Sequence, residues 1–129
     1  MQDIIERLEK ATGPDRELDR ELGFAFCGWR VVDIAGNQCI DQGDGEINAD
    51  HPGGMYTSFT ESIDAAMTLV VEGFRWVIES KEWSELRETY LVPVAYVESE
   101  LPDRSKSFRA EGATPAIALC IAALKARQA

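Results

Sequence analysis

Apolar residues at the start of the chain recur at helical spacing. One apolar stripe with charged residues around it predicts a short amphipathic helix over residues 3–11; the stripe consists of Ile4, Ile5, Leu8 and Ala11. Gly13 and Pro14 predict its end, because glycine suits a left-handed cap and proline cannot extend the hydrogen-bond ladder. A second helix is expected from about Asp15, with Asp15 or Thr12 as its cap. Its inward positions are expected to be Leu18, Leu22, Ala25 and Phe26.

The middle of the chain carries strand, loop and helix signals in turn. Residues 29–36 are rich in β-branched side chains and predict a short strand, whereas residues 37–55 contain glycines, aspartates and a proline and predict a long loop. Such a loop is uncommon in a compact domain and is either functional or mobile. A helix is then expected from a cap at Ser58 or Thr60. Its buried stripe is expected to be Ile63, Ala66, Met67 and Val70.

Three segments in the second half carry strand patterns. Residues 72–80 alternate apolar and polar positions, which places Trp76 on the core face. Residues 86–99 are rich in β-branched and aromatic side chains, and Pro93 indicates an edge or a bulge because it removes one ladder donor. Residues 106–112 predict a third strand after a turn. We expect these strands to form an antiparallel meander.

The last helix is the least polar part of the chain. Thr114 is a favoured cap and Pro115 a favoured first position, so the helix is expected to run from there to about Arg127. About a dozen residues at about 1.5 Å each cannot cross a hydrocarbon core, which takes about 20. A helix that is apolar on all sides must be covered on all sides. We therefore expect it at the centre of the core against the sheet. The alternative that a second subunit covers its other side remains open.

These elements predict a single α+β domain over residues 1–129, with a small antiparallel sheet of three to four strands packed between α-helical layers. A chain of 129 residues has the length of one ordinary domain. An apolar share of 45% and a charged share of 28% are close to globular averages, which argues against disordered and fibrous proteins. The three cysteines include no CxxC pair and predict neither a disulfide framework nor a zinc site.

Acidic residues outnumber basic ones by 23 to 13, which gives a formal net charge of −10. This balance disfavours direct binding to nucleic acid or to an anionic membrane surface, so neither is expected as a partner. The first residues lack the basic and apolar pattern of a secretory signal. We expect a cytoplasmic location. The acidity serves solubility, or it imitates the phosphate backbone of DNA to occupy a DNA-binding protein.

No residue pattern predicts catalysis or a cofactor. His51 follows Asp50 in the glycine-rich loop, but no nucleophile elbow accompanies them. A calcium loop counted from Asp41 would need carboxylates where Gly43 and Gly45 stand. Dinucleotide and phosphate-loop motifs are absent from the sequence. We therefore expect a protein that is not an enzyme and has no cofactor and no metal; a hydrolase built on Asp50 and His51 is the less favoured alternative.

An acidic block with a tryptophan in its middle is the first candidate for a protein interface. Trp83 lies among charges in a predicted turn, and tryptophans are frequent hot spots of interfaces when they are exposed. The surrounding carboxylates would suit a basic partner surface. The predicted interface comprises Trp83, Glu79, Glu82, Glu85, Glu88, Glu98, Glu100 and Asp103.

Three segments resemble a group of small bacteriophage proteins: ELDRELGFAFCGWR, YTSFTESIDAAMTLV and FRAEGATPAIALCIAALKAR. The chain resembles the phage ABA-sandwich domain family at Gly28, Trp29, Tyr56, Thr57, Ala65, Ala66 and over residues 116–126, the last being the most specific part. The resemblance implies a phage or prophage origin, hence a bacterial host cell, and strands sandwiched between helical layers. It brings no catalytic residues. Phe24, Phe26 and the long strand around Pro93 depart from the family pattern.

The favoured hypothesis is a small, non-enzymatic phage accessory protein that binds and inhibits a host or defence protein, including a nucleic-acid-binding one, through its acidic surface. One alternative is a sponge that sequesters a small signalling nucleotide in a pocket or a subunit interface. Its arginines would hold phosphates and its aromatic rings would stack on the base; these residues are Trp29, Arg30, Tyr56, Arg75 and Arg109. The other alternative is a virion or assembly component. A homo-oligomer remains open.

Overall fold

The structure is a computed structural model that describes residues 2–43, 47–49, 57–84, 89–99 and 106–128. Within these ranges the helices are α1 (Gln2–Lys10), α2 (Arg16–Phe26), α3 (Ile63–Met67) and α4 (Pro115–Gln128). The strands are β1 (Arg30–Ile34), β2 (Asn37–Asp41), β3 (Ile47–Ala49), β4 (Phe74–Ser84), β5 (Thr89–Ser99) and β6 (Ser107–Glu111). The α+β class predicted from the sequence is confirmed.

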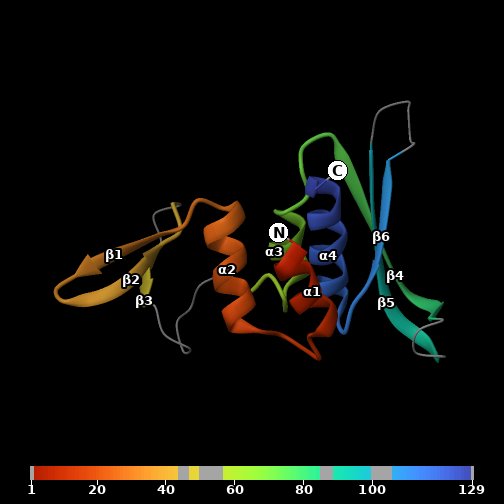
Figure 1. The fold of residues 1–129 in the computed structure, drawn as a ribbon, viewed down its shortest axis with the longest axis horizontal. Helices are drawn as coiled ribbons and strands as arrows, with labels where there is room; N and C mark the ends of the chain where they lie inside the picture. Colours follow the sequence, from red (N-terminus) through yellow and green to blue (C-terminus); the bar gives the residue numbers. More distant parts are fainter. Residues whose placement is uncertain (1, 44–46, 50–56, 85–88, 100–105, 129) are drawn as a thin grey trace.

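Helix α4 is the centre of the molecule. Figure 1 shows it between the β4–β6 sheet on one side and the other helices on the other side. Every residue from Ile117 to Leu124 has an exposed fraction of 0%. The cap is the predicted one, because Thr114 Oγ1 accepts a hydrogen bond of 3.1 Å from Ile117 N and the helix begins at Pro115. The expectation of a central core helix is therefore confirmed, and this chain itself covers all sides of that stretch.

The three C-terminal strands form one antiparallel sheet in the order β4-β5-β6. Its inner face lies on α4 and places Ala95, Val97 and Ala110 in the core. Trp76 shares this face with its cross-strand partner Val97, as predicted, but its side chain is 36% exposed because β4 is an edge strand. The layer order differs from the expectation in one respect. The described helices gather on one side of the sheet, so α4 rather than the sheet is the enclosed layer (Figure 1).

A second antiparallel sheet, in the order β1-β2-β3, was not predicted. The segment 37–55, predicted as a loop, contains β2 and β3. A two-residue turn joins β1 to β2, and both turn residues have positive φ, 52° at Ala35 and 85° at Gly36. This geometry is that of a type I′ hairpin turn, which matches the twist of the strands that it joins. The β1–β3 sheet projects from the helical body beyond α2 (Figure 1).

Three of the four predicted helices are placed correctly and one is not. Asp15 caps α2, since its carboxylate accepts hydrogen bonds from Glu17 N and Leu18 N at 3.0 and 3.1 Å. Helix α3 is shorter than predicted and is capped by Ser62, not by Ser58 or Thr60. Thr60 is instead fully buried, because it binds α2 as described below.

Three smaller expectations about the helices were also wrong. Gly13 does not adopt the left-handed conformation expected of a cap. Ala25 is exposed, whereas Asp19 and Gly23 take buried positions on α2. Ile63 and Met67, expected in the buried stripe of α3, are 37% and 42% exposed. None of the helices described by the structure is long and apolar enough to cross a membrane.

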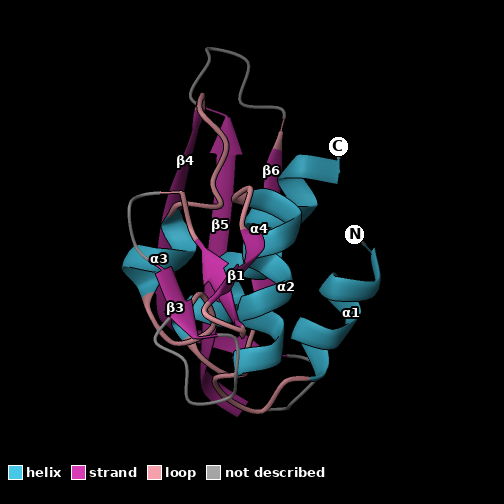
Figure 2. Ribbon diagram, turned by 90° about the vertical axis from the view of Figure 1, so that its left-hand side faces the viewer, coloured by secondary structure: helices cyan, strands magenta, loops and turns pink. Residues whose placement is uncertain are grey.

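The ends of the described chain lie close together. Figure 2 shows α1 beside α4, with the first and last described residues on the same side of the molecule. Gln128 Nε2 donates a hydrogen bond of 3.2 Å to Gln2 Oε1. Ile5 and Leu8 bury the inner face of α1 in the core, so the first helix packs against the last.

Candidate interaction surface

The outer face of the β4–β6 sheet is the surface that gathers the most predicted site residues. Directly opposed residues of an antiparallel sheet share one face, and the faces alternate along each strand. The register Val77↔Tyr96↔Arg109 therefore defines the middle row of the face turned away from α4. By the same register, the described outer positions are Arg75, Val77, Glu79, Val94, Tyr96, Glu98, Ser107, Arg109 and Glu111.

Charged side chains occupy the two ends of this outer face. Arg75 donates from Nε and Nη2 to Glu98 Oε2 at 3.2 and 2.9 Å, a pair placed directly across β4 and β5. Arg109 Nη2 lies 3.8 Å from Glu111 Oε1 along β6. Glu79 is exposed. The arginines of these two pairs are exposed, whereas the side chains of Glu98 and Glu111 are only 27% and 16% exposed.

The centre of the outer face is less polar than its ends. Val77 is 42% exposed and lies directly opposite the half-buried Tyr96. Interfaces between proteins have an apolar centre with aromatic anchors and a polar rim. In the middle row Val77 and Tyr96 supply the apolar and aromatic part, beside Arg109. The flanking rows contain Arg75 and Glu98 on one side and Glu79 and Glu111 on the other, where Val94 is fully buried. No described helix covers the face (Figure 1).

The acidic interface predicted from the sequence is placed in part on this face. Glu79 and Glu98 both lie on it. Glu82 and Trp83 belong to β4, which continues to Ser84, so the turn predicted around Trp83 is wrong. Only the strand positions of Glu82 and Trp83 are described, not their side chains. The other predicted members, Glu85, Glu88, Glu100 and Asp103, lie outside the described residues.

The residues of the nucleotide alternative do not come together. Trp29 is 6% exposed and packs in the core, with its ring centroid 5.7 Å from that of Phe59. Arg30 lies on β1, at the opposite end of the molecule from Arg75 and Arg109 on the β4–β6 sheet (Figure 1). Tyr56 lies outside the described residues. The described members thus provide neither an exposed stacking ring nor a common phosphate site.

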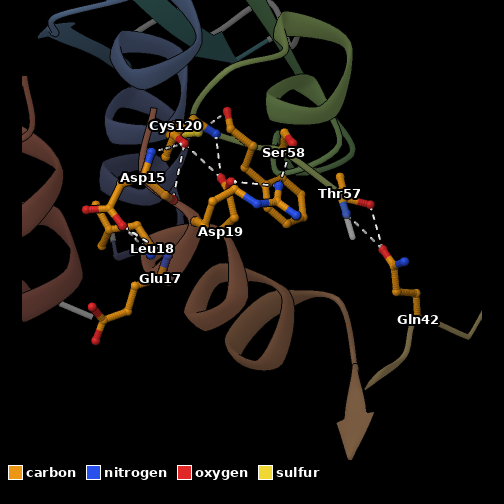
Figure 3. A network of polar contacts seen from close by, with 11 residues as sticks. Asp15, Glu17, Leu18, Asp19, Gln42, Thr57, Ser58 and Cys120 are labelled. Carbon is orange, nitrogen blue, oxygen red and sulfur yellow. Dashed lines mark hydrogen bonds and ion pairs between the residues drawn. The ribbon is translucent and has the colours of Figure 1, made fainter. Parts of the chain in front are cut away.

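A buried polar network joins α2, residues 57–60 and α4 (Figure 3). Asp19 is fully buried, and its Oδ1 accepts hydrogen bonds from Thr60 N at 2.8 Å and Thr60 Oγ1 at 2.9 Å. Its Oδ2 lies 3.3 Å from Arg16 Nη1, which also donates to Ser58 Oγ at 2.6 Å. Thr114 Oγ1 then donates to Thr60 O at 3.2 Å. The Asp19 carboxylate thereby joins α2 to the segment around Thr60, and Thr114 joins that segment to the start of α4.

The chemistry of this network indicates a structural role. Burial raises the pKa of Asp19, against the opposing effect of the Thr60 hydrogen bonds and of Arg16. Cys120 donates its Sγ–H to Phe59 O at 3.3 Å, and burial, with Asp19 nearby, raises the pKa of the thiol. A thiol held protonated is a poor nucleophile. Sequence reasoning missed Asp19 because a single aspartate on a helix has no local signal of burial.

A smaller polar contact joins the β1–β3 sheet to the body. Gln42 Oε1 accepts hydrogen bonds from Thr57 N at 3.2 Å and from Thr57 Oγ1 at 2.7 Å (Figure 3). Gln42 is 8% exposed, and its Nε2 has no acceptor among the described residues. Asp50 and His51, the residues of the enzyme alternative, lie outside the described residues. Among the residues that the structure describes, no group of three or more His, Cys, Asp or Glu side chains could hold a metal ion.

Comparison with known proteins assigns no relative to this chain. No protein-family model matches it, no curated protein matches it, and no solved structure matches it. The resemblance to phage ABA-sandwich proteins therefore stays a prediction from the sequence.

Proposed function

We propose that this chain is a non-enzymatic binding protein that inhibits a partner protein through the outer face of its β4–β6 sheet. The observation that carries the proposal is the composition of that face: Val77 and Tyr96 opposite each other in the middle row, charged residues around them, and no described helix over the face (Figure 1). The phage resemblance suggests a host or defence protein as the partner, including one that binds nucleic acid. Because the described thiol and carboxylate of the core are buried, the exterior of the protein is where a partner would act.

Electrostatics support a basic partner. The formal net charge of −10 attracts basic surfaces over distances of about a Debye length, roughly 8 to 10 Å at ordinary salt, and raises the rate of encounter. Glu79 and Glu98 would then help to set the orientation, while Val77 and Tyr96 would supply the area that excludes water. Binding should accordingly weaken as salt rises.

The test is capture of partners from bacterial lysate with three forms of the immobilised protein. Wild type is compared with Glu79→Lys, which alters the outer face. The control is Glu9→Lys, which makes the same change of net charge at an exposed residue of α1. We expect a partner that is retained by wild type and Glu9→Lys, is lost from Glu79→Lys, and elutes at high salt. Purified partner should then lose activity when this protein is added.

Two results would overturn the proposal. One is a partner list that changes neither with Glu79→Lys nor with salt. The other is equal loss with Glu79→Lys and Glu9→Lys, which would show a general effect of charge without a contact at the outer face.

A further inference from the structure

Strand β1 is the sheet edge with the most exposed aliphatic side chains among the strands that the structure describes. Native proteins protect edges by short length, bulges or charged side chains. Strand β3 has three residues, and β4 has register shifts after Glu79. Strands β1 and β6 each pair with a neighbour over five consecutive residues without a shift, and both carry exposed charged residues, but β6 exposes no aliphatic side chain. Two aliphatic side chains of β1 are about half exposed, Val31 at 47% and Ile34 at 46%.

The hairpin geometry determines which backbone groups of β1 face the open edge. In a two-residue hairpin the residues beside the turn, here Ile34 and Asn37, form a hydrogen-bonded pair. Hydrogen-bonded pairs alternate along an antiparallel ladder. The N–H and C=O groups of Val31 and Asp33 therefore point away from β2 and toward the edge. These groups can form antiparallel hydrogen bonds with two residues of an added strand.

We propose that this edge binds an extended segment of a partner protein as an additional antiparallel strand, and that the segment alternates aliphatic with basic residues. The aliphatic residues would lie opposite Val32 and Ile34, and a basic residue would lie opposite Asp33. This inference concerns a surface at the other end of the molecule from the outer sheet face and does not depend on it (Figure 1).

The charge pattern of the edge selects a basic partner. Arg30 is already paired with Asp41, with Nη2 2.9 Å from Oδ2. Asp33 is exposed and accepts one hydrogen bond, from Gly36 N at 3.0 Å. Among the described residues beside the edge, the charge without an ion pair is therefore the Asp33 carboxylate, on a chain of net charge −10. A lysine or arginine opposite Asp33 would complement it, and its aliphatic stem could cover Val31.

A second copy of this chain fits the edge less well. When two β1 strands pair edge to edge across a two-fold axis, the same face of each strand lies on the same side of the joined sheet. Arg30 and Asp33 lie on opposite faces of β1. Neither Asp33 could then pair with the Arg30 of the other copy. Self-pairing would also bring together two chains that each carry −10.

The experiment uses an acetylated eight-residue peptide in which valine alternates with lysine, and a control peptide in which glutamate replaces each lysine. Binding to the full chain is followed by calorimetry and by amide hydrogen exchange. We expect the lysine peptide to bind and to protect the amides of Val31 and Asp33, while that of Val32, already bonded to β2, changes little. The glutamate peptide should not bind.

Two variants of Val31 test the backbone contact. Val31→Pro removes an N–H that faces the edge without removing a ladder bond, whereas Val31→Thr keeps it. We expect Val31→Pro to weaken peptide binding about fivefold or more, the loss of one hydrogen bond, and Val31→Thr to keep most of the affinity. Circular dichroism checks that both variants fold. If Val31→Pro does not fold, the hydrogen-exchange pattern of the wild-type protein with the peptide tests the backbone contact.

Three results would overturn the inference. The first is no binding of the lysine peptide, or equal binding of the glutamate peptide. The second is binding that leaves the amides of Val31 and Asp33 unprotected. The third is self-association that Val31→Pro abolishes, seen by sedimentation in the absence of peptide, which would assign the edge to a second copy instead.

Discussion

Replacing Asp19 by alanine should destabilise the protein far more than its position on an ordinary helix suggests. Asp19 is fully buried, and its loss leaves the buried Thr60 N–H without its acceptor, 2.8 Å away in the wild type. A buried donor left unpaired costs about 1–3 kcal/mol. The partly exposed Arg16 loses its carboxylate but keeps its bond to Ser58, so its share is smaller. We expect a loss of about 2–4 kcal/mol in the free energy of unfolding.

Urea unfolding followed by circular dichroism measures this loss. The matched control is Glu17→Ala on the same helix, because the Glu17 side chain is 81% exposed and makes only a distant ion pair of 4.0 Å with Arg7. Glu17→Ala should change the free energy of unfolding by no more than about 0.5 kcal/mol. Equal and small losses in Asp19→Ala and Glu17→Ala would refute the idea that the buried Asp19 carboxylate joins α2 to the segment around Thr60.

Two further predictions concern the same core. Gly23→Ala should destabilise the protein by about 1–3 kcal/mol, because a Cβ at Gly23 would lie 2.1 Å from ring atoms of Trp29. Thermal unfolding measures the loss. The control is Gly13→Ala, which should not destabilise the protein because nothing lies within 4 Å of a Cβ there. Burial raises the pKa of Asp19 in the folded state, so the folded protein binds a proton more readily than the unfolded chain above the ordinary value of 3.8. Wild type should therefore gain stability relative to Asp19→Asn as pH falls through the interval between the raised pKa and 3.8, and lose it as pH rises; a difference that stays constant with pH would contradict this.

The helices and the C-terminal sheet could be predicted because their signals are local. The apolar stripe of α1, the Asp15 cap of α2 and the Thr114–Pro115 start of α4 are each carried by neighbouring residues. Alternation along residues 74–79 likewise indicated β4 correctly. For α4 the absence of any polar side implied burial on all sides, and its residues are buried accordingly.

The features that were missed depend on partners distant in the sequence. The turn at Ala35–Gly36 has positive φ at an alanine, a residue that rarely adopts it, so the β1–β2 hairpin had no usual turn signal. Thr60 has the composition of a helix cap, but it binds Asp19, 41 positions earlier in the chain. Trp83 lies among charged residues that suggested a turn, yet pairing with β5 extends β4 through it.

The central claim is that α4 is enclosed by this chain, so that recognition takes place on the exterior, and the reactivity of Cys120 tests it most directly. Cys120 lies on α4 with an exposed fraction of 0%, while Cys27 and Cys39 are half-buried. The native protein is treated briefly with iodoacetamide, and the modified cysteines are located by mass spectrometry. We predict modification at Cys39, slower modification at Cys27, because burial raises the pKa of its thiol, and modification at Cys120 only after denaturant is added. Modification of Cys120 in the native protein at the rate of Cys39 would contradict the account.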